Sequence, residues 1–283
     1  MKYIIVPVDF SEECLSGVQL ALLFSRKTPV TIELVYVLQK ITEHRPSTPD
    51  SERDYAEKQL NAMVAKFSPT LGKDSKLKYI IKKGRIYQEV VNQAQSRTDS
   101  IITASTHGAS GFQEFFIGSN AYRIISATDR PVITIRRGNC PENISRIVLP
   151  VDNTIDSRQK VPYTIEMARL FHAEIHVVGI QTSKSEREVK RIRTYVGQVA
   201  GFIQGKVKVV TNEVYGDNVA DMVVNYARSV KADMISITTE QGAGLSLIIG
   251  NTAHQLLNKS EIPILSQSPK KKLVSGGFSS SGG

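Results

Sequence analysis

The chain has 283 residues, of which 41% are hydrophobic and 22% charged, a composition typical of a globular protein with room for about two domains. No apolar run approaches the ~18 residues of a membrane-spanning helix, and Pro7 and Asp9 interrupt the apolar start where a secretion signal would continue, so a cytoplasmic location without membrane association is expected. The net charge of +9 forms no basic stripe with interleaved aromatic residues, which argues against nucleic-acid binding.

The first half of the chain alternates between predicted strands and predicted helices. Continuous apolar runs predict buried strands, covered on both faces, at 2–9 and 30–38, and further strands are predicted at 76–81, 99–104 and 131–136. Apolar residues at helical spacing predict helices at 11–26, 51–67, 87–96 and 119–128. The polar segment 40–50, which contains two prolines, is expected to be an exposed loop. This alternation predicts a parallel, doubly wound sheet with right-handed crossovers.

The same pattern then restarts, which indicates a duplicated unit. The opening strand MKYIIVPVD is matched by SRIVLPVD at 145–152. The other matching strands are predicted at 173–180, 206–216, 232–238 and 262–265. We therefore predict one domain over 1–142 and a second over 143–268. Residues 269–283, rich in Lys, Gly and Ser, are predicted to be a flexible basic tail.

A glycine-bearing turn follows the predicted fourth strand of the first half. Residues 101–120 read IITASTHGASGFQEFFIGSN, with Gly108 and Gly111 in the turn and Gly118-Ser119 before the next helix. A strand that runs into such a turn exposes backbone N–H groups that can bind phosphate. The loop has two places where its backbone can come close to a ligand, and this suits a polyphosphate. The competing interpretation is an ordinary turn between a strand and a helix, because short glycine patterns are weak evidence on their own.

These residues resemble the nucleotide motif of the universal stress protein family, G-x2-G-x9-G-[ST], preceded by a first strand that ends in Asp. Residues 105–119 read S-T-H-G, nine residues, then G-S, and the first strand ends in VPVD. The resemblance covers 1–137 and recurs more faintly over 145–268. The chain thus resembles a tandem universal stress protein. The resemblance implies an α/β fold of two doubly wound, five-stranded parallel-sheet domains, Rossmann-like and of the adenine nucleotide alpha hydrolase type.

The resemblance also implies that the first domain binds ATP with Mg²⁺. Asp9 would accept a hydrogen bond from a ribose hydroxyl or the adenine edge, and the phosphates would meet the glycine motif with a divalent ion bridging them. The implied contact residues are Pro7, Val8, Asp9, Val37, Ala104, Ser105, Gly108, Gly118, Ser119 and Asn120. Ser105 stands where the motif has its first glycine. If that position needs a positive φ, serine costs about 1–2 kcal/mol there.

The second half departs further from the motif. Thr239-Glu240-Gln241-Gly242 replaces the first segment, Gly250-Asn251 replaces Gly-Ser, and seven rather than nine residues separate the two glycines. Two missing residues shorten the reach of the loop by up to ~7 Å, and Glu240 adds a negative charge. We predict that the second domain has lost the standard mode of ATP binding. Asp152 is retained, so a nucleoside or a nucleotide held differently stays open.

The sequence offers no constellation for catalysis or metal binding. His107 lies in the loop and could act as a general base, but it has no carboxylate nearby in the sequence to orient it, and its counterpart is Gln241. We therefore expect a stress-response regulatory protein without catalytic residues or a metal centre of its own. A slow ATP hydrolase is one alternative.

The other alternative is a signalling module that binds no nucleotide and acts by dimerisation. In the family the fifth strands pair across a dimer. Residues 131–135 and 262–265 could make the same pair within one chain, as a pseudo-dimer. A homodimer of the whole chain is left open by the sequence.

Overall fold

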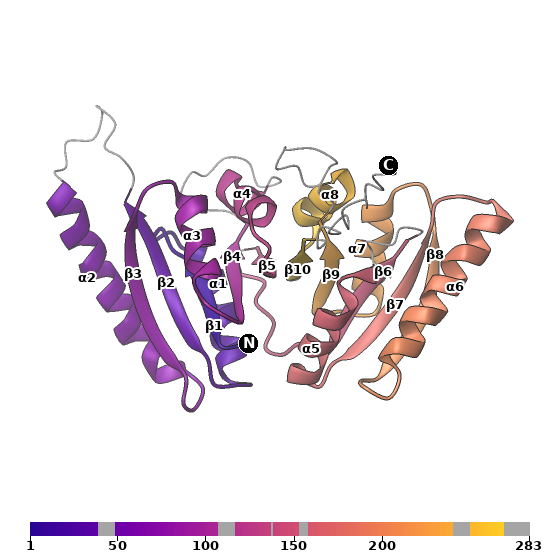
Figure 1. Ribbon diagram of the computed structural model, residues 1–283, viewed down its shortest axis with the longest axis horizontal. Helices are drawn as coiled ribbons and strands as arrows, with labels where there is room; N and C mark the ends of the chain where they lie inside the picture. The colour runs from indigo at the N-terminus through magenta and orange to yellow at the C-terminus, as the bar shows by residue number, and fades with distance from the viewer. Residues whose placement is uncertain (39–48, 107–116, 137, 153–157, 240–249, 269–283) are drawn as a thin grey trace, which may run out of the picture.

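The protein folds around a single ten-stranded sheet (Figure 1). The computed structural model describes residues 1–38, 49–106, 117–136, 138–152, 158–239 and 250–268. The strands of the first half are β1 (Tyr3–Pro7), β2 (Thr31–Leu38), β3 (Lys76–Lys83), β4 (Ser100–Ser105) and β5 (Val132–Ile135). Those of the second half are β6 (Arg146–Val151), β7 (Glu174–Gln181), β8 (Val209–Tyr215), β9 (Met234–Thr238) and β10 (Ile264–Gln267).

The helices alternate with these strands. In the first half they are α1 (Cys14–Ser25), α2 (Pro49–Phe67), α3 (Ile86–Gln95) and α4 (Ser119–Ala127), with a short 3-10 helix at Ser68–Thr70. In the second half they are α5 (Val161–Phe171), α6 (Glu186–Ile203), α7 (Val219–Ser229) and α8 (Asn251–Lys259). None of the helices in the described part of the chain is long and apolar enough to cross a membrane.

The sheet joins two repeats through an antiparallel seam. Its strand order is β3-β2-β1-β4-β5-β10-β9-β6-β7-β8, and every neighbouring pair is parallel except β5 and β10. At the seam Ile133 lies opposite Leu265, and Thr134 opposite Ile264. The expected pairing of the two fifth strands within one chain is therefore confirmed. Figure 1 shows α2 and α6 at the two far ends and α4 beside α8 above the seam.

Helices cover both faces of the sheet, which explains the uninterrupted apolar strands. Side chains alternate along a strand, so Ile4 and Val6 pack in the layer of α1, α2, α5 and α6, whereas Ile5 packs in the layer of α3, α4, α7 and α8. All three side chains are fully buried. The rings of Phe24 and Phe171 meet edge to face at 4.8 Å, so the core of the first layer is continuous between the repeats.

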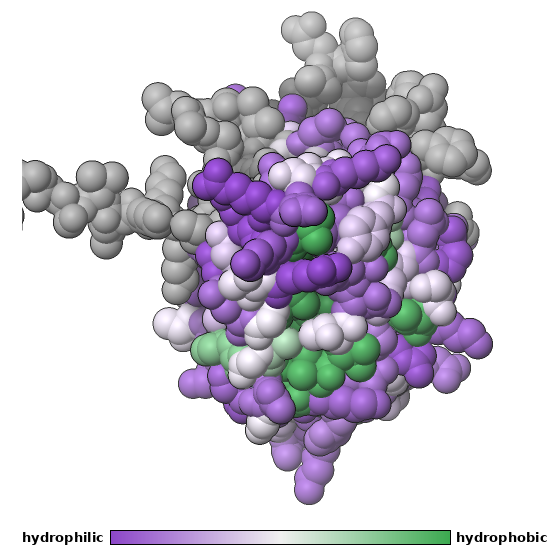
Figure 2. Space-filling model, turned by 90° about the vertical axis from the view of Figure 1, so that its right-hand side faces the viewer, coloured by the Kyte–Doolittle hydropathy of each residue, from purple (hydrophilic) through white to green (hydrophobic). Residues whose placement is uncertain are grey.

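The two ends of the sheet differ in character. The edge strand β3 carries four lysines, a charge pattern that discourages pairing with another strand: Lys76, Lys78, Lys82 and Lys83. At the other end, hydrophobic residues gather on the outer side of the second repeat, in the region of α6 and β8 (Figure 2). There Phe202 is 52% exposed and Tyr215 59% exposed.

Several boundaries differ from the sequence-based expectation by two or three residues, and for two of them the structure gives a reason. Helix α2 begins at Pro49 and not at 51, since proline is well suited to the first turn of a helix. Most of the segment expected to be an exposed loop, residues 39–48, lies outside the described residues. Strand β10 begins at Ile264 and not at Ile262, because Ser260 holds the preceding turn through hydrogen bonds with the carbonyl and N–H of Ile262.

Candidate functional site

The first repeat has its topological switch point at β1 and β4. From β1 the chain continues to β2 on one side, while β4 lies on the other. The backbone ladder between the two strands joins Tyr3–Ile5 to Ser100–Ile102, so Pro7 and Ser105, the last residues of the strands, lie beyond it. Open α/β sheets bind ligands at the carboxyl ends of strands at this place. We call this place the first switch point.

Asp9 stands at the carboxyl end of β1 and is held in a local hydrogen-bond network. Its Oδ1 accepts from the N–H of Ser11 at 3.1 Å and from the Ser11 hydroxyl at 2.5 Å. The Ser11 Oγ in turn accepts from the N–H of Cys14, the first residue of α1. The carboxylate is exposed, so it lies at the mouth of the switch point with a fixed orientation.

The residue after Asp9 has an unusual backbone. Phe10 has a φ of 64°, in the left-handed region, which costs a bulky L residue about 1–2 kcal/mol. Its ring stacks on Tyr36 of β2 with centroids 4.6 Å apart, and Tyr55 meets it edge-on at 6.0 Å. This aromatic packing offsets the strain and fixes the turn that separates Asp9 from α1.

On the opposite side of the switch point, β4 ends in an ordinary extended conformation. Ser105 is the last residue of β4 and pairs with Ile135 of β5, and its φ is not positive. The cost that a left-handed serine would carry therefore does not arise. Beyond it, the N–H of Thr106 donates to the Ile135 carbonyl at 2.9 Å, and the Thr106 carbonyl accepts from the N–H of Gly118 at 2.5 Å. Thr106, just after β4, and Gly118, just before α4, therefore lie next to each other at the carboxyl end of β4.

Gly118, Ser119 and Asn120 form the start of α4. Gly118 is the N-cap, with φ −60° and ψ 145°, and no side chain caps the helix. The first intrahelical bond runs from Tyr122 N–H to the Gly118 carbonyl, so the N–H groups of the first turn precede the helical ladder. Ser119 and Asn120 are exposed. An uncapped helix start of this kind attracts anions. Gly108, His107 and Gly111 lie outside the described residues.

Helix α1 approaches β4 closely because residue 17 is glycine. A Cβ at Gly17 would lie 3.3 Å from the Thr103 carbonyl oxygen and 3.4 Å from the Ala104 Cα. The Thr103 hydroxyl donates to the Gly17 carbonyl at 3.0 Å. The sequence analysis missed Gly17, which is a glycine inside an apolar helix, and such a residue signals close packing.

The two valines of the predicted site lie on opposite faces of the sheet. The Val8 side chain is buried in the layer of α1 and α2, and its N–H donates to the Val35 carbonyl at 3.0 Å. The Val37 side chain is buried in the layer of α3 and α4. Only Val37 shares a face with α4, so Val8 can offer a ligand little beyond its backbone.

The second switch point, at the carboxyl ends of β6 and β9, repeats this framework with different side chains. Its ladder joins Ile147–Val148 to Met234–Ile235, and Asp152 follows β6. Gly250 caps α8 with φ −55° and ψ 150°, nearly the angles of Gly118. Thr164 takes the place of Gly17, and its buried hydroxyl bonds the Lys160 carbonyl at 2.8 Å and the Ser236 hydroxyl at 2.7 Å. Residues 240–249, with Glu240, Gln241 and Gly242, lie outside the described residues.

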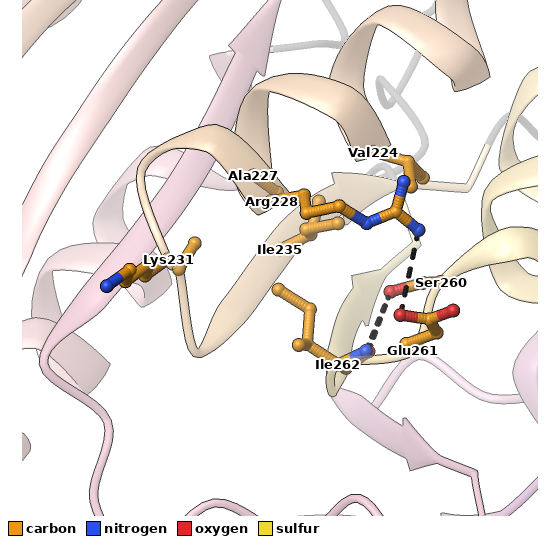
Figure 3. Close-up of a pocket in the computed structure, with 9 residues that line it drawn as sticks. Val224, Ala227, Arg228, Lys231, Ile235, Ser260, Glu261 and Ile262 are labelled. Atoms are coloured by element: carbon orange, nitrogen blue, oxygen red, sulfur yellow. Dashed lines mark hydrogen bonds and ion pairs between the residues drawn. The ribbon is translucent and has the colours of Figure 1, made fainter.

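A separate pocket lies near the amino ends of β9 and β10, away from the carboxyl ends of the strands. It has a volume of about 200 Å³ and is lined by residues of α7 and of the turns that lead into β9 and β10 (Figure 3). Arg228 pairs with Glu261 at 3.6 Å across its rim, and the Lys231 ammonium points away from it. Ile235 and Ile262 make its walls apolar. No residue of the predicted site borders this pocket.

The described residues contain no cluster of three His, Cys, Asp or Glu side chains that could hold a metal ion. Cys14 is buried and bonded to the Ser11 carbonyl, and burial raises the pKa of its thiol to about 11. A thiol with so high a pKa is a poor nucleophile. Among the described residues of the first switch point, the groups that can bind a ligand by hydrogen bonds are the Asp9 carboxylate and the N–H groups at the start of α4.

The comparison with family models gives a match to the Universal stress protein family over residues 1–136 and again over 143–266. A universal stress protein from Archaeoglobus fulgidus has a similar structure, with 18% identity and a TM-score of 0.73 over 94% of this chain and 96% of that chain. A functionally unknown protein from Pseudomonas aeruginosa follows, with 16% identity and a TM-score of 0.61 over 95% and 93%. These identities establish the fold alone.

A universal stress protein from Archaeoglobus fulgidus in complex with dAMP also matches, with 16% identity and a TM-score of 0.36 over 44% of this chain and 96% of that chain. The comparison with curated proteins gives no match.

Proposed function

We propose that this chain, which belongs to the universal stress protein family, is a stress-response regulatory protein that binds ATP at the first switch point. The observation that carries the proposal is that an oriented Asp9 carboxylate and the uncapped start of α4 both lie at the carboxyl ends of the strands. A carboxylate can accept from ribose hydroxyls, and helix N–H groups can donate to phosphates. These two interactions, both at the carboxyl ends of the strands, suit a nucleotide.

Each part of the nucleotide has a counterpart in this arrangement. The ribose would lie against Ala104 and Ser105, whose extended backbone leaves no strain to oppose binding. The phosphates would meet Ser119 and Asn120 at the helix start. Mg²⁺ would arrive on the phosphates, because it is commonly held by phosphate oxygens with few protein ligands. The described residues supply no metal cage of their own.

The proposal is binding without efficient turnover. Among the residues that the structure describes, Cys14 is buried, and the Asp9 carboxylate already accepts from Ser11. Neither group forms a nucleophile–base pair of the kind that hydrolysis requires. We therefore propose a regulatory role in which nucleotide occupancy, and not product formation, is the signal.

The test is calorimetric titration of ATP with Mg²⁺ into the full chain and into matched variants. Asp9→Ala is expected to weaken binding at least tenfold, while Asp152→Ala, its counterpart in the second repeat, changes the dissociation constant less than twofold. Asp9→Asn keeps an oxygen for Ser11, so it separates the local fold from the carboxylate charge. If Asp152→Ala loses ATP binding and Asp9→Ala keeps it, the nucleotide site lies in the second repeat and the proposal is wrong. Failure of the unmodified chain to bind ATP would favour the nucleotide-free dimerisation module.

A further inference from the structure

The pocket near the amino ends of β9 and β10 is a cavity that the proposed nucleotide site does not use. It holds about 200 Å³ and lies between α7, the turn into β9 and the turn into β10 (Figure 3). Ala227 and Ile235, which line it, belong to the core and are 3% and 1% exposed. An apolar cavity of about 150 Å³ can hold benzene. This pocket therefore has room for one ring, or a branched alkyl group, with a small substituent.

The backbone that borders the pocket has its hydrogen bonds made within the protein. The Ser260 hydroxyl donates to the Ile262 carbonyl at 2.8 Å and accepts from the Ile262 N–H at 3.3 Å. The N–H of Ala232 donates to the Ala227 carbonyl, in the last turn of α7, at 2.8 Å. These bonds fix the walls, and the side chains of Ile235, Ile262 and the two alanines offer a ligand apolar contact.

Arg228 supplies a cation at the rim of this apolar pocket. Figure 3 shows its guanidinium reaching toward Glu261, while the Lys231 ammonium points away. The Arg228 Nη2 and Glu261 Oε2 atoms are 3.6 Å apart, and the two side chains are 62% and 64% exposed. An exposed pair at this distance contributes little to stability. Because a guanidinium has several N–H donors in a planar fork, Arg228 can also bind the carboxylate of a ligand in the bidentate manner.

The first repeat has a charged residue where this pocket has an apolar wall. The Thr128 hydroxyl accepts from the N–H of Arg130 at 3.0 Å, just as the Ser260 hydroxyl accepts from the N–H of Ile262. The two turns are therefore equivalent, and Arg130 is the counterpart of Ile262. A long cationic side chain at this position does not form the apolar wall that Ile262 provides.

The first repeat also lacks the cation on the helix. Gln93 of α3 and Tyr226 of α7 are equivalent, since each bonds the buried polar residue of the second strand of its repeat. Two residues further on, Gln95 is the counterpart of Arg228. The combination of an apolar wall with a cation at the rim therefore belongs to the second repeat.

We propose that this pocket binds a small monocarboxylate whose body is an aryl ring or a branched alkyl group. The body would pack against Ile235 and Ile262, and the carboxylate would pair with the Arg228 guanidinium. A carboxylate suits the site better than an alcohol because charge-assisted hydrogen bonds to a guanidinium are stronger than neutral ones. This inference does not rest on ATP binding, because no residue of the predicted nucleotide site borders the pocket.

The experiment is a titration of benzoate into the full chain with labelled isoleucine methyl groups, followed by NMR. The methyl signals of Ile235 and Ile262 are expected to shift saturably, with a dissociation constant of about 0.1–10 mM for so small a ligand. Ile102, the counterpart of Ile235 in β4, should not shift. Benzyl alcohol keeps the ring without the charge and should bind at least about fivefold more weakly. Equal affinities for the two probes, or no saturable Ile235 shift with benzoate, would overturn the proposal.

Variants at exposed positions assign the carboxylate contact. Arg228→Gln should weaken benzoate about tenfold and leave benzyl alcohol unchanged, whereas Lys231→Gln, the matched control, should change either affinity less than twofold. Glu261→Gln removes the competing acid, so benzoate should bind several-fold more tightly. Val224→Phe adds bulk to the wall at a half-buried position and should weaken both probes. An equal loss in Lys231→Gln and Arg228→Gln, or weaker benzoate binding by Glu261→Gln, would contradict the assignment.

Discussion

The second repeat holds the first switch point in place through Asn258 of α8. Its Oδ1 accepts from the N–H of Ile117 at 2.5 Å, directly before the Gly118 cap. Asn258→Ala leaves that N–H without its acceptor. The Ile117 residue is 8% exposed, and an unsatisfied buried donor costs about 1–3 kcal/mol. If the whole cost falls on the binding-competent conformation, the dissociation constant for ATP rises between about fivefold and about 150-fold.

Two measurements check this prediction. Calorimetry with ATP gives the change in affinity, and hydrogen exchange of the Ile117 amide reports the lost bond without any nucleotide. Gln255→Ala is the matched control, because Gln255 lies on the same helix but bonds Asn218 of its own repeat. An Asn258→Ala chain that keeps both its ATP affinity and its slow Ile117 exchange would refute the reasoning. So would an equal loss in the Gln255→Ala control.

Three further predictions concern stability and packing. Hydrogen bonds from Lys208 and His176 hold the pKa of Glu174 near 2. The contribution of this carboxylate to the free energy of unfolding is therefore complete above pH ~4.5 and is lost as the pH falls through about 2. Glu174→Gln should lower the free energy of unfolding at pH 7 by about 2–3 kcal/mol, a difference that narrows toward pH 2 in urea titrations. Gly72→Ala should destabilise the chain by about 3 kcal/mol in thermal unfolding, because the new Cβ would lie 1.7 Å from the Ser25 carbonyl oxygen. Gly17→Val should cost about 1–3 kcal/mol by separating α1 from β4, and it should weaken ATP binding more than Thr164→Val does.

The repeated pattern of apolar strands was sufficient to predict the architecture. A parallel strand buried on both faces must be apolar throughout, so IIV in β1 and IVL in β6 were recognisable without a structure. The seam between the repeats was predicted from the family resemblance. Its antiparallel register, Ile133 opposite Leu265, depends on tertiary packing that no local pattern encodes.

The site was only partly predictable, because its geometry depends on contacts between distant residues. Asp9 and Gly118 were identified from a motif, and Ser105 proved to be ordinary strand backbone. Gly17 was missed because only the position of β4 shows what a Cβ would touch.

The covalent link between the repeats allows the side chains of the two repeats to differ. In a dimer of identical chains every substitution occurs at both sites, whereas here each position changes alone. The core position between β2 and α3 holds Glu33, bonded to Gln93 and Arg97, and its counterpart in the second repeat is His176, bonded to Tyr226. Both sets satisfy their buried polar atoms, so either one preserves the fold. At the seam, Ile133 faces Leu265, and the two flanking pairs each join an apolar residue to Thr134 or Ser266. A tandem chain can therefore change the side chains of one switch point without changing those of the other.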